Sequence, residues 1–317
     1  MYFFEDAGIS TWPWLPPLVA LVISFFTSMG GVSGAFLLLP FQMSFLGYTA
    51  PSVSATNQLF NVVAIPSGVY RYIREGRMVW PLTWVVIAGT LPGVLIGAIV
   101  RVKYLPDPST FKLFAAAVLL YIGGRMVRDL TIRRQASAEK DAEQRFHESV
   151  RRGPGSDATD RECSTTRVIS FGLTRLEYDF HGGRYRVSTL RVFVLCLLVG
   201  VVGGIYGIGG GAIVAPFFVS FFRLPVYTIA GAALMGTFVT SVAGVAFYQG
   251  IAPFYPAMSV SPDWKLGILF GIGGALGMYL GARCQKFVPA KLIKWMLAGI
   301  IVFTAASYIW SFLASLI

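Results

Sequence analysis

Long apolar stretches alternate with short polar ones along most of the chain. Six of these stretches have roughly the 20 residues that an α-helix needs to cross a bilayer. They are residues 52–72, 79–100, 110–127, 228–249, 265–282 and 293–316. This pattern predicts an all-α membrane protein with several crossing helices.

Two further apolar stretches, 15–46 and 189–222, are too long for one ordinary crossing and contain clustered glycines. The clusters lie in TSMGGVSGAFLLLP and GGIYGIGGGAIVAP. Glycine weakens a helix and lets backbones approach closely, and lipid tolerates a broken helix only where protein or a water-filled cavity surrounds the break. We therefore expect each stretch to form a hairpin of two half-helices, the second starting near Gly34 and near Gly210. A single straight crossing is the alternative.

A polar stretch, residues 131–187, separates two membrane regions. Its first part is highly charged and poor in aromatic residues, which is typical of a helix that runs into a flexible loop. Its second part, TRLEYDFHGGRYRVSTLRV, alternates apolar and polar residues around HGG, which indicates a short β-hairpin. We expect residues 1–130 to form a first membrane repeat, 131–187 an insert, and 188–317 a second membrane repeat.

The two membrane regions resemble one another in the spacing of glycine and proline. Among the matching pairs are Gly31 with Gly207, Gly34 with Gly210, Pro40 with Pro216, and the triplet Gly89, Gly93 and Gly97 with Gly273, Gly277 and Gly281. Each triplet forms a GxxxGxxxG face, which is typical of close helix packing. Because each half would hold one hairpin and three crossings, the second repeat is expected to be inverted relative to the first.

Basic residues predict which ends face the cytoplasm, because loops rich in lysine and arginine stay inside. The insert is rich in arginine, and so are the short segments 71–77 and 283–294. Placing all three inside puts both termini outside, provided that each glycine-broken stretch enters and returns on the same side. Arg101 and Lys103 mildly oppose this topology, since they fall at an outside loop.

Composition agrees with a membrane protein. Of the 317 residues, 55% are hydrophobic and 13% charged, and the mean hydropathy is +0.66, whereas soluble domains carry about 25% charged residues. The net charge of +11 is explained by basic loops, so no nucleic-acid partner is expected. The three cysteines form neither a disulfide framework nor a zinc site, so we expect no metal and no cofactor.

The apolar stretches contain no Asp or Glu, and both histidines, His147 and His181, fall in the insert. Proton pumps and cation carriers usually keep buried carboxylates, so a cation substrate is disfavoured. A helix that restarts inside the membrane presents unpaired N–H groups and a positive dipole end, which bind anions. Hydroxyl and amide side chains donate to oxyanions as well, although each of them could equally serve to join helices. The candidate anion-binding residues are Gly30, Gly31, Ser33, Gly34, Asn57, Gln58, Asn61, Gly207, Gly209, Gly210, Gly211, Thr237, Thr240 and Ser241.

These same residues resemble the TauE/SafE family of sulfite and organosulfonate exporters. The motifs GGVSGAFLLLP, SATNQLFNVVAIPSGVYRYIREGRMVW, GIGGGAIVAPFF and GAALMGTFVTSVAG carry the resemblance. It covers residues 15–130 and 189–315 and leaves the insert unexplained. This chain has Thr56-Asn57 where family members often have Thr-Ser. The resemblance implies a secondary transporter that exports sulfite, an organosulfonate or a related sulfur compound across the bacterial inner membrane by alternating access.

Two other functions compete with transport. The run GVSG, residues 31–34, fits a rhomboid-like serine protease, but that chemistry needs a base beside the serine and no apolar stretch contains histidine. We therefore expect no enzyme. A non-transporting membrane scaffold whose insert binds a partner is the alternative that stays open. The expected partners are the lipid bilayer and a small anion, and the sequence allows a homo-oligomer without fixing one.

Overall fold

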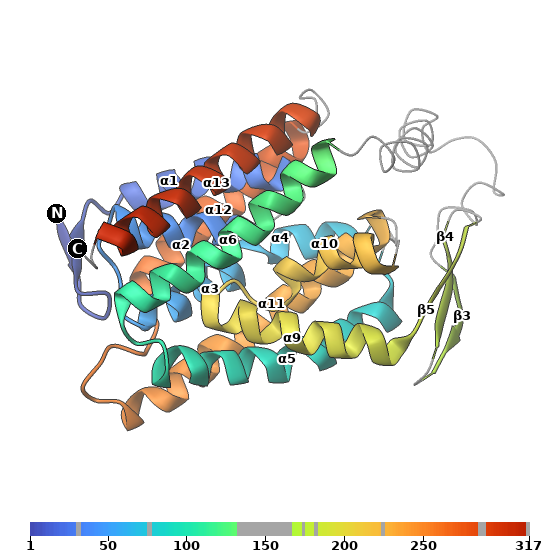
Figure 1. The fold of residues 1–317 in the computed structure, drawn as a ribbon, viewed down its shortest axis with the longest axis horizontal. Helices are drawn as coiled ribbons and strands as arrows, with labels where there is room; N and C mark the ends of the chain where they lie inside the picture. The colour runs from blue at the N-terminus through green and yellow to red at the C-terminus, as the bar shows by residue number, and fades with distance from the viewer. Residues whose placement is uncertain are drawn as a thin grey trace.

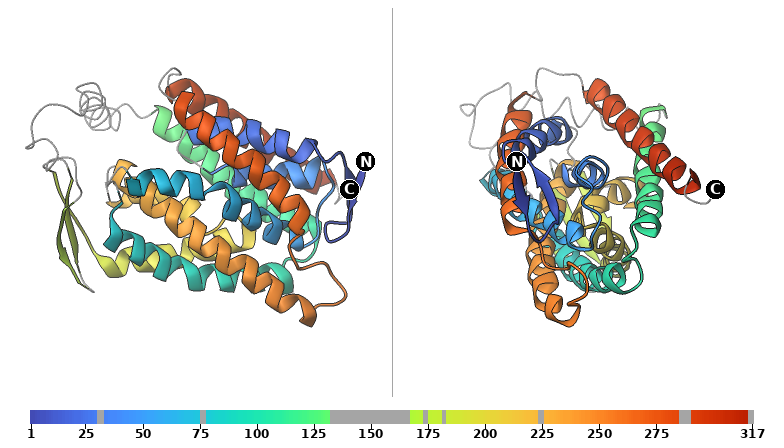
Figure 2. Two further views of the ribbon diagram at one scale, coloured as in Figure 1. Left: turned by 180° about the vertical axis from the view of Figure 1, so that it is seen from behind. Right: turned by 90° about the vertical axis from the view of Figure 1, so that its left-hand side faces the viewer.

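The computed structural model describes residues 1–29, 33–74, 78–131, 167–172, 175–180, 183–222, 226–284 and 290–314. Most of the helices run roughly along one direction, and both chain termini lie at the same end of the bundle (Figures 1 and 2). A small sheet lies at the opposite end. We call these the terminal end and the sheet end.

The described part of the first membrane region holds six helices. They are α1 (Leu15–Met29), α2 (Ala35–Ser44), α3 (Ser52–Ala64), α4 (Pro66–Arg74), α5 (Trp80–Lys103) and α6 (Pro108–Thr131). The stretch 15–46 therefore holds two helices and not one continuous rod. The single crossing expected over 52–72 is divided as well, because Pro66 has no N–H with which to continue the helical hydrogen bonds of α3.

The second membrane region follows a similar order. Its helices are α9 (Thr189–Tyr206), α10 (Gly211–Phe222), α11 (Val226–Ile251), the short 3₁₀ helix η1 (Ala252–Phe254), α12 (Trp264–Cys284) and α13 (Ala290–Ala314). Here too the glycine-rich stretch is divided, since α9 ends at Tyr206 and α10 begins at Gly211.

Four described helices are long and apolar enough to cross a membrane. They are Trp80–Lys103, Thr189–Tyr206, Ile229–Phe254 and Trp264–Gly281. Because a helix rises 1.5 Å per residue, the 18 residues of α9 extend about 27 Å, close to the thickness of a bilayer core. The two limbs of the stretch 189–222 are therefore unequal, and the first is longer than the half-helix that the sequence led us to expect.

Short strands lie at both ends of the bundle. At the terminal end β1 (Tyr2–Phe4) pairs antiparallel with β2 (Ile9–Thr11), which the sequence analysis did not predict. At the sheet end β3 (Arg167–Phe171), β4 (Leu176–Phe180) and β5 (Gly183–Val187) form an antiparallel sheet in that order. Strands β4 and β5 flank the HGG run from which we predicted a hairpin. The Thr189 hydroxyl donates to the Gly172 carbonyl at 2.7 Å and links the sheet to α9. The stretch 132–166, for which we predicted a helix and a loop, lies outside the described residues.

Glycine rows make the closest contacts between helices. Helix α5 packs along α9, and α12 packs along α1. A Cβ atom on Gly93 would lie 2.8 Å from the Val201 nitrogen, and one on Gly277 would lie 2.9 Å from the Leu21 carbonyl carbon. These distances leave no room for a side chain, which confirms the prediction that both GxxxGxxxG faces pack helices.

These pairings cross between the two regions. The glycine row of the first region, on α5, lies on α9 of the second, and the glycine row of the second, on α12, lies on α1 of the first. Helix α3 contacts α12 just as α11 contacts α5, and α3 and α11 also contact one another. The last long helices of the two regions, α6 and α13, pack together at one side of the bundle (Figure 2).

Candidate functional site

Helix α9 ends at two glycines that take left-handed backbone conformations. Gly207 has a φ of 81° and Gly209 a φ of 74°, values that a residue with a Cβ adopts only at a cost. The N–H groups of Gly207 and Ile208 both bond to the Gly203 carbonyl, at 2.9 and 3.0 Å, and close the last turn. The glycines of the GIGGG run therefore end one helix and allow the next to begin.

The carbonyl groups at this helix end are satisfied by side chains from α3 and α11, because the helix itself leaves its last carbonyls without partners. The donors and acceptors are Tyr248 Oη to Gly204 O at 3.4 Å, Ser54 Oγ to Ile205 O at 3.1 Å, Asn57 Nδ2 to Gly207 O at 3.1 Å, and Asn61 Nδ2 to Ile208 O at 3.0 Å. Three of the four donors lie on one face of α3. Two predicted site residues, Asn57 and Asn61, therefore bond to backbone of the other membrane region.

The first helix break lies directly beside the second. Asn57 Nδ2 also donates to the Ala35 carbonyl, in the first turn of α2, at 3.0 Å. The Ser33 hydroxyl donates to Asn61 Oδ1 at 2.9 Å, and Gly34 is the N-cap residue of α2. The two predicted residues Gly30 and Gly31 lie outside the described residues. We call the meeting of 33–35 with 207–211 the helix junction.

A proline inside α2 strengthens the helix junction. Pro40 has no N–H, so the Phe36 carbonyl one turn earlier loses its helical partner. The hydroxyl of Tyr206, the last residue of α9, donates to this carbonyl at 2.9 Å. On α13, Tyr308 donates to the Pro40 carbonyl at 3.2 Å. Loss of one backbone donor thus creates a contact between the two membrane regions.

Helix α11 covers the other side of the second break with three predicted residues, Thr237, Thr240 and Ser241. The Gly210 N–H donates to Thr240 Oγ1 at 3.2 Å. A Cβ on Gly209 would lie 2.8 Å from Ser241 Oγ, and one on Gly211 would lie 2.7 Å from the Thr237 nitrogen. The start of α10 is therefore held tightly against α11, and glycine is the residue that fits there.

Two predicted residues have buried polar groups that find no partner among the described residues. The side-chain oxygen and nitrogen of Gln58 and the hydroxyl of Ser241 form no hydrogen bond with any described residue. Gln58 and Ser241 are each 0% exposed. Gln58 packs against Gly244, which lies one turn after Ser241 on α11. Since buried polar groups are nearly always hydrogen-bonded, these atoms are the ones that a polar ligand would satisfy.

The structure thus brings together Ser33, Gly34, Asn57, Gln58, Asn61, Gly207, Gly209, Gly210, Gly211, Thr237, Thr240 and Ser241, all of them among the described residues. Each polar side chain in this set is buried inside the protein. Sequence reasoning missed Ser54 and Tyr248, which hold the end of α9. Ser54 could have been found, because it lies on the same helical face as Asn57 and Asn61, at spacings of three and seven residues.

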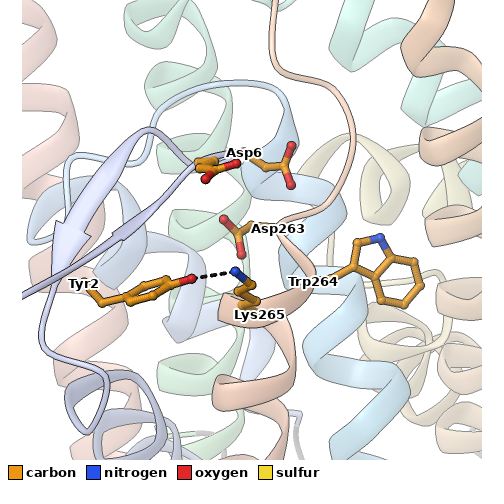
Figure 3. Close-up of a pocket in the computed structure, with 6 residues that line it drawn as sticks. Tyr2, Asp6, Asp263, Trp264 and Lys265 are labelled. Atoms are coloured by element: carbon orange, nitrogen blue, oxygen red, sulfur yellow. Dashed lines mark hydrogen bonds between the residues drawn. The ribbon is translucent and has the colours of Figure 1, made fainter.

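A pocket of about 130 Å³ lies at the terminal end and not at the helix junction (Figure 3). It is lined by Tyr2, Glu5, Asp6, Asp263, Trp264 and Lys265. The Lys265 amine donates to the Tyr2 hydroxyl, and burial together with the nearby charge of Asp263 raises the pKa of the Asp6 carboxyl. Among the described residues, its carboxylates form no group that could hold a metal ion. With three acids and one base, this pocket is a poor place for an anion.

Comparisons with known proteins agree with the membrane architecture. A family model described as "Sulfite exporter TauE/SafE" matches residues 17–308. The probable membrane transporter protein YdhB of Bacillus subtilis is 27% identical over 116 residues, 37% of this chain and 44% of the relative. Probable membrane transporter proteins of Xylella fastidiosa and Methanocaldococcus jannaschii are each 28% identical, over 40% and 43% of this chain and 47% and 48% of their own. The chain thus matches about half the length of these curated relatives. No solved structure matches the chain.

Proposed function

Because the chain belongs to the sulfite exporter TauE/SafE family, whose members are membrane transporters and not enzymes, we propose that it exports a small anion, with sulfite or an organosulfonate as the first candidates. The protein is a multi-pass membrane protein. One observation supports the location of the site above all others: Asn57 Nδ2 bonds to both helix breaks at once. Two interrupted helices therefore meet inside the protein, as transporter substrate sites require.

The bonding at the helix junction supports a division of roles. The carbonyl ends are occupied by side chains, Asn57 and Asn61 among them, so these two residues hold the junction. The first N–H groups of α10 have no partner within the helix, and its dipole end is positive. Ser241 lies beside Gly209 and Gln58 beside Gly244, and both keep buried donors that find no partner among the described residues. We assign these donors to the oxygens of the transported anion.

The crossed packing supports an alternating-access cycle. If α1 exchanges places with α9, and α5 with α12, the pairing of α5 with α9 becomes the pairing of α12 with α1. A pseudo-twofold axis between inverted repeats would make this exchange. In this proposal the helix junction lies on that axis, and the polar side chains of the junction are buried. We take the conformation described here as closed to both sides, and opening would be a rocking of one repeat against the other.

The membrane potential favours export in the proposed topology, with the sheet end in the cytoplasm and the termini outside. Moving one negative charge outward across 100 mV, inside negative, releases about 2.3 kcal/mol. A dianion would release about twice that. Such an exporter needs no buried carboxylate to couple transport to protons, and the described crossing helices contain none. The inner membrane of a bacterium is the location that this reading implies.

The proposal is tested with purified protein in liposomes loaded with radiolabelled sulfite, methanesulfonate or isethionate. We expect anion efflux faster than that of protein-free liposomes. The efflux should accelerate when the imposed potential is negative inside and repels the anion from the lumen. Protein-free liposomes and liposomes with an unrelated helical membrane protein are the controls. Efflux equal to both controls for all three anions would refute the export function.

Replacing Gln58 with methionine separates binding from packing. Methionine has nearly the same shape but no polar atoms, so it removes two unpaired buried groups. We expect the Gln58→Met protein to unfold at the wild-type temperature or above, while its half-saturating sulfite concentration rises at least tenfold. Thermal unfolding in detergent and flux in liposomes measure the two quantities. A lower unfolding temperature with unchanged half-saturation would mean that Gln58 only joins helices.

A further inference from the structure

Arg101 is the largest side chain that is fully buried within the described residues. It lies in the last turn of α5, and the loop from α5 to α6 lies at the terminal end (Figure 1). The sequence analysis counts Arg101, together with Lys103, as a loop charge that opposes the predicted topology. The burial of Arg101 raises another question, because a buried charge is costly unless something pairs with it.

The protein neutralises the Arg101 charge only in part. The guanidinium donates to the carbonyls of Leu105 and Thr49 and lies 3.7 Å from the centre of the Phe111 ring. Its Nε is buried and has no partner among the described residues. No described carboxylate pairs with it, and the ionisable groups near it are the hydroxyls of Tyr48 and Tyr248. The site thus has one full positive charge, an unused N–H donor and two hydroxyl groups.

The two tyrosines near Arg101 have hydrogen bonds that lead toward the helix junction, with one route from each tyrosine. Tyr248 donates to the Gly204 carbonyl at the end of α9. On the other route, the Tyr48 N–H donates to the Gln42 carbonyl at 2.9 Å, and Gln42 Nε2 donates to Asn57 Oδ1 at 3.3 Å. Arg101 therefore lies between the helix junction and the terminal end.

The glycine row on α5 gives an independent estimate of the separation. A Cβ on Gly97 would lie 2.9 Å from Gly204 Cα, so α5 touches the end of α9 at this residue. Arg101 follows four residues later, about 6 Å further along the helix. The start of α10 lies further back along α5, because a Cβ on Gly210 would overlap the Thr90 side chain. Arg101 follows Thr90 by eleven residues, so an anion that leaves the start of α10 toward the terminal end would move about 16 Å along α5 to reach the level of Arg101.

Building on the export function proposed above, we propose that Arg101 forms a second anion subsite, which receives the sulfur oxyanion after it leaves the helix junction. A guanidinium presents donors in a planar fork that matches the oxygens of a sulfonate or sulfite group. The junction holds the anion with neutral donors, so a cation on the outer side attracts it outward. The Tyr48 and Tyr248 hydroxyls lie near this charge but already bond to Thr56 and to the Gly204 carbonyl, so Arg101 supplies the donors of the subsite.

The test compares three variants in the sulfite liposome assay, with thermal unfolding measured in parallel. We expect Arg101→Gln to raise the half-saturating sulfite concentration at least tenfold. Arg101→Lys, which keeps the charge and loses the fork, is expected to raise it about threefold. Lys103→Gln, an exposed charge two residues away, removes the same net charge and is expected to change it less than twofold.

Half-saturation is the deciding readout, because loss of the bonds to Leu105 and Thr49 alone would lower the unfolding temperature without changing the affinity for sulfite. Should Arg101→Gln fail to fold, Arg101→Lys decides in its place. Half-saturation equal to that of Lys103→Gln in every folded Arg101 variant overturns the second subsite. Absence of sulfite flux in the wild-type protein would instead overturn the export function itself, so the two failures are distinguishable.

Discussion

Replacing Asn57 with aspartate is expected to cost at least about 3 kcal/mol of folding stability and to abolish anion flux. The Asn57 Nδ2 atom donates to the Ala35 and Gly207 carbonyls, and an aspartate oxygen in its place would face both of them without a proton to share. Each buried acceptor that loses its donor costs about 1–3 kcal/mol. Whole domains are stable by only about 5–15 kcal/mol, so the loss is a large fraction of the total.

The matched control is Gln249→Glu, which makes the same amide-to-carboxylate change at an exposed position. Gln249 accepts a hydrogen bond from Trp264 Nε1 through its oxygen, and glutamate keeps that acceptor. We expect this control to unfold within a few degrees of the wild type and to transport normally. Thermal unfolding in detergent and sulfite flux measure both variants. An Asn57→Asp protein as stable as its control would show that this amide does not hold the two breaks together.

Replacing Gly211 with alanine is expected to destabilise the protein by about 1–3 kcal/mol, the usual range for overpacking, and to reduce flux more than tenfold. The added Cβ would overlap the Ala233 carbonyl oxygen and lie 2.7 Å from the Thr237 nitrogen. Both are backbone atoms of α11, which cannot rotate away as a side chain can. Helix α10 would have to shift, and the first N–H groups that we assign to the anion would shift with it.

Gly299→Ala serves as the control for this change. Gly299 lies inside α13, and a Cβ there would meet nothing within 4 Å. Since alanine favours helix over glycine by up to about 1 kcal/mol, this variant is expected to match or exceed the wild-type unfolding temperature. Wild-type flux and stability in Gly211→Ala would mean that α10 does not need its close contact with α11.

Glycine positions carried most of the structural information that the sequence offered. The clusters near Gly34 and Gly210 predicted helix starts, and the structure begins α2 at Ala35 and α10 at Gly211. The GxxxGxxxG triplets predicted close packing, which the backbone contacts of Gly93 and Gly277 confirm. These predictions succeeded because glycine has no Cβ, so its position in the sequence indicates where the backbone can turn or approach another helix closely.

The partners of polar side chains were not predictable in the same way. Asn57 and Asn61 were correctly placed on one helical face, but each donates to a carbonyl about 150 residues away, at a helix end whose position depends on the whole fold. The loop rule for basic residues counted Arg101 as an ordinary loop charge, since the rule does not know which charges are buried in the folded protein. The division of residues 52–72 at Pro66 was readable in principle from the proline alone.

The crossed glycine rows have a consequence for how the chain is made. When the ribosome has released α5, the surface that fits its glycines is still untranslated, because that surface is α9. Helix α1 is likewise made long before α12, whose glycines pack against it. The glycine row of α5 therefore stays uncovered in the bilayer until α9 is made. The contact between α1 and α12 forms later still, because α12 follows α9 in the chain.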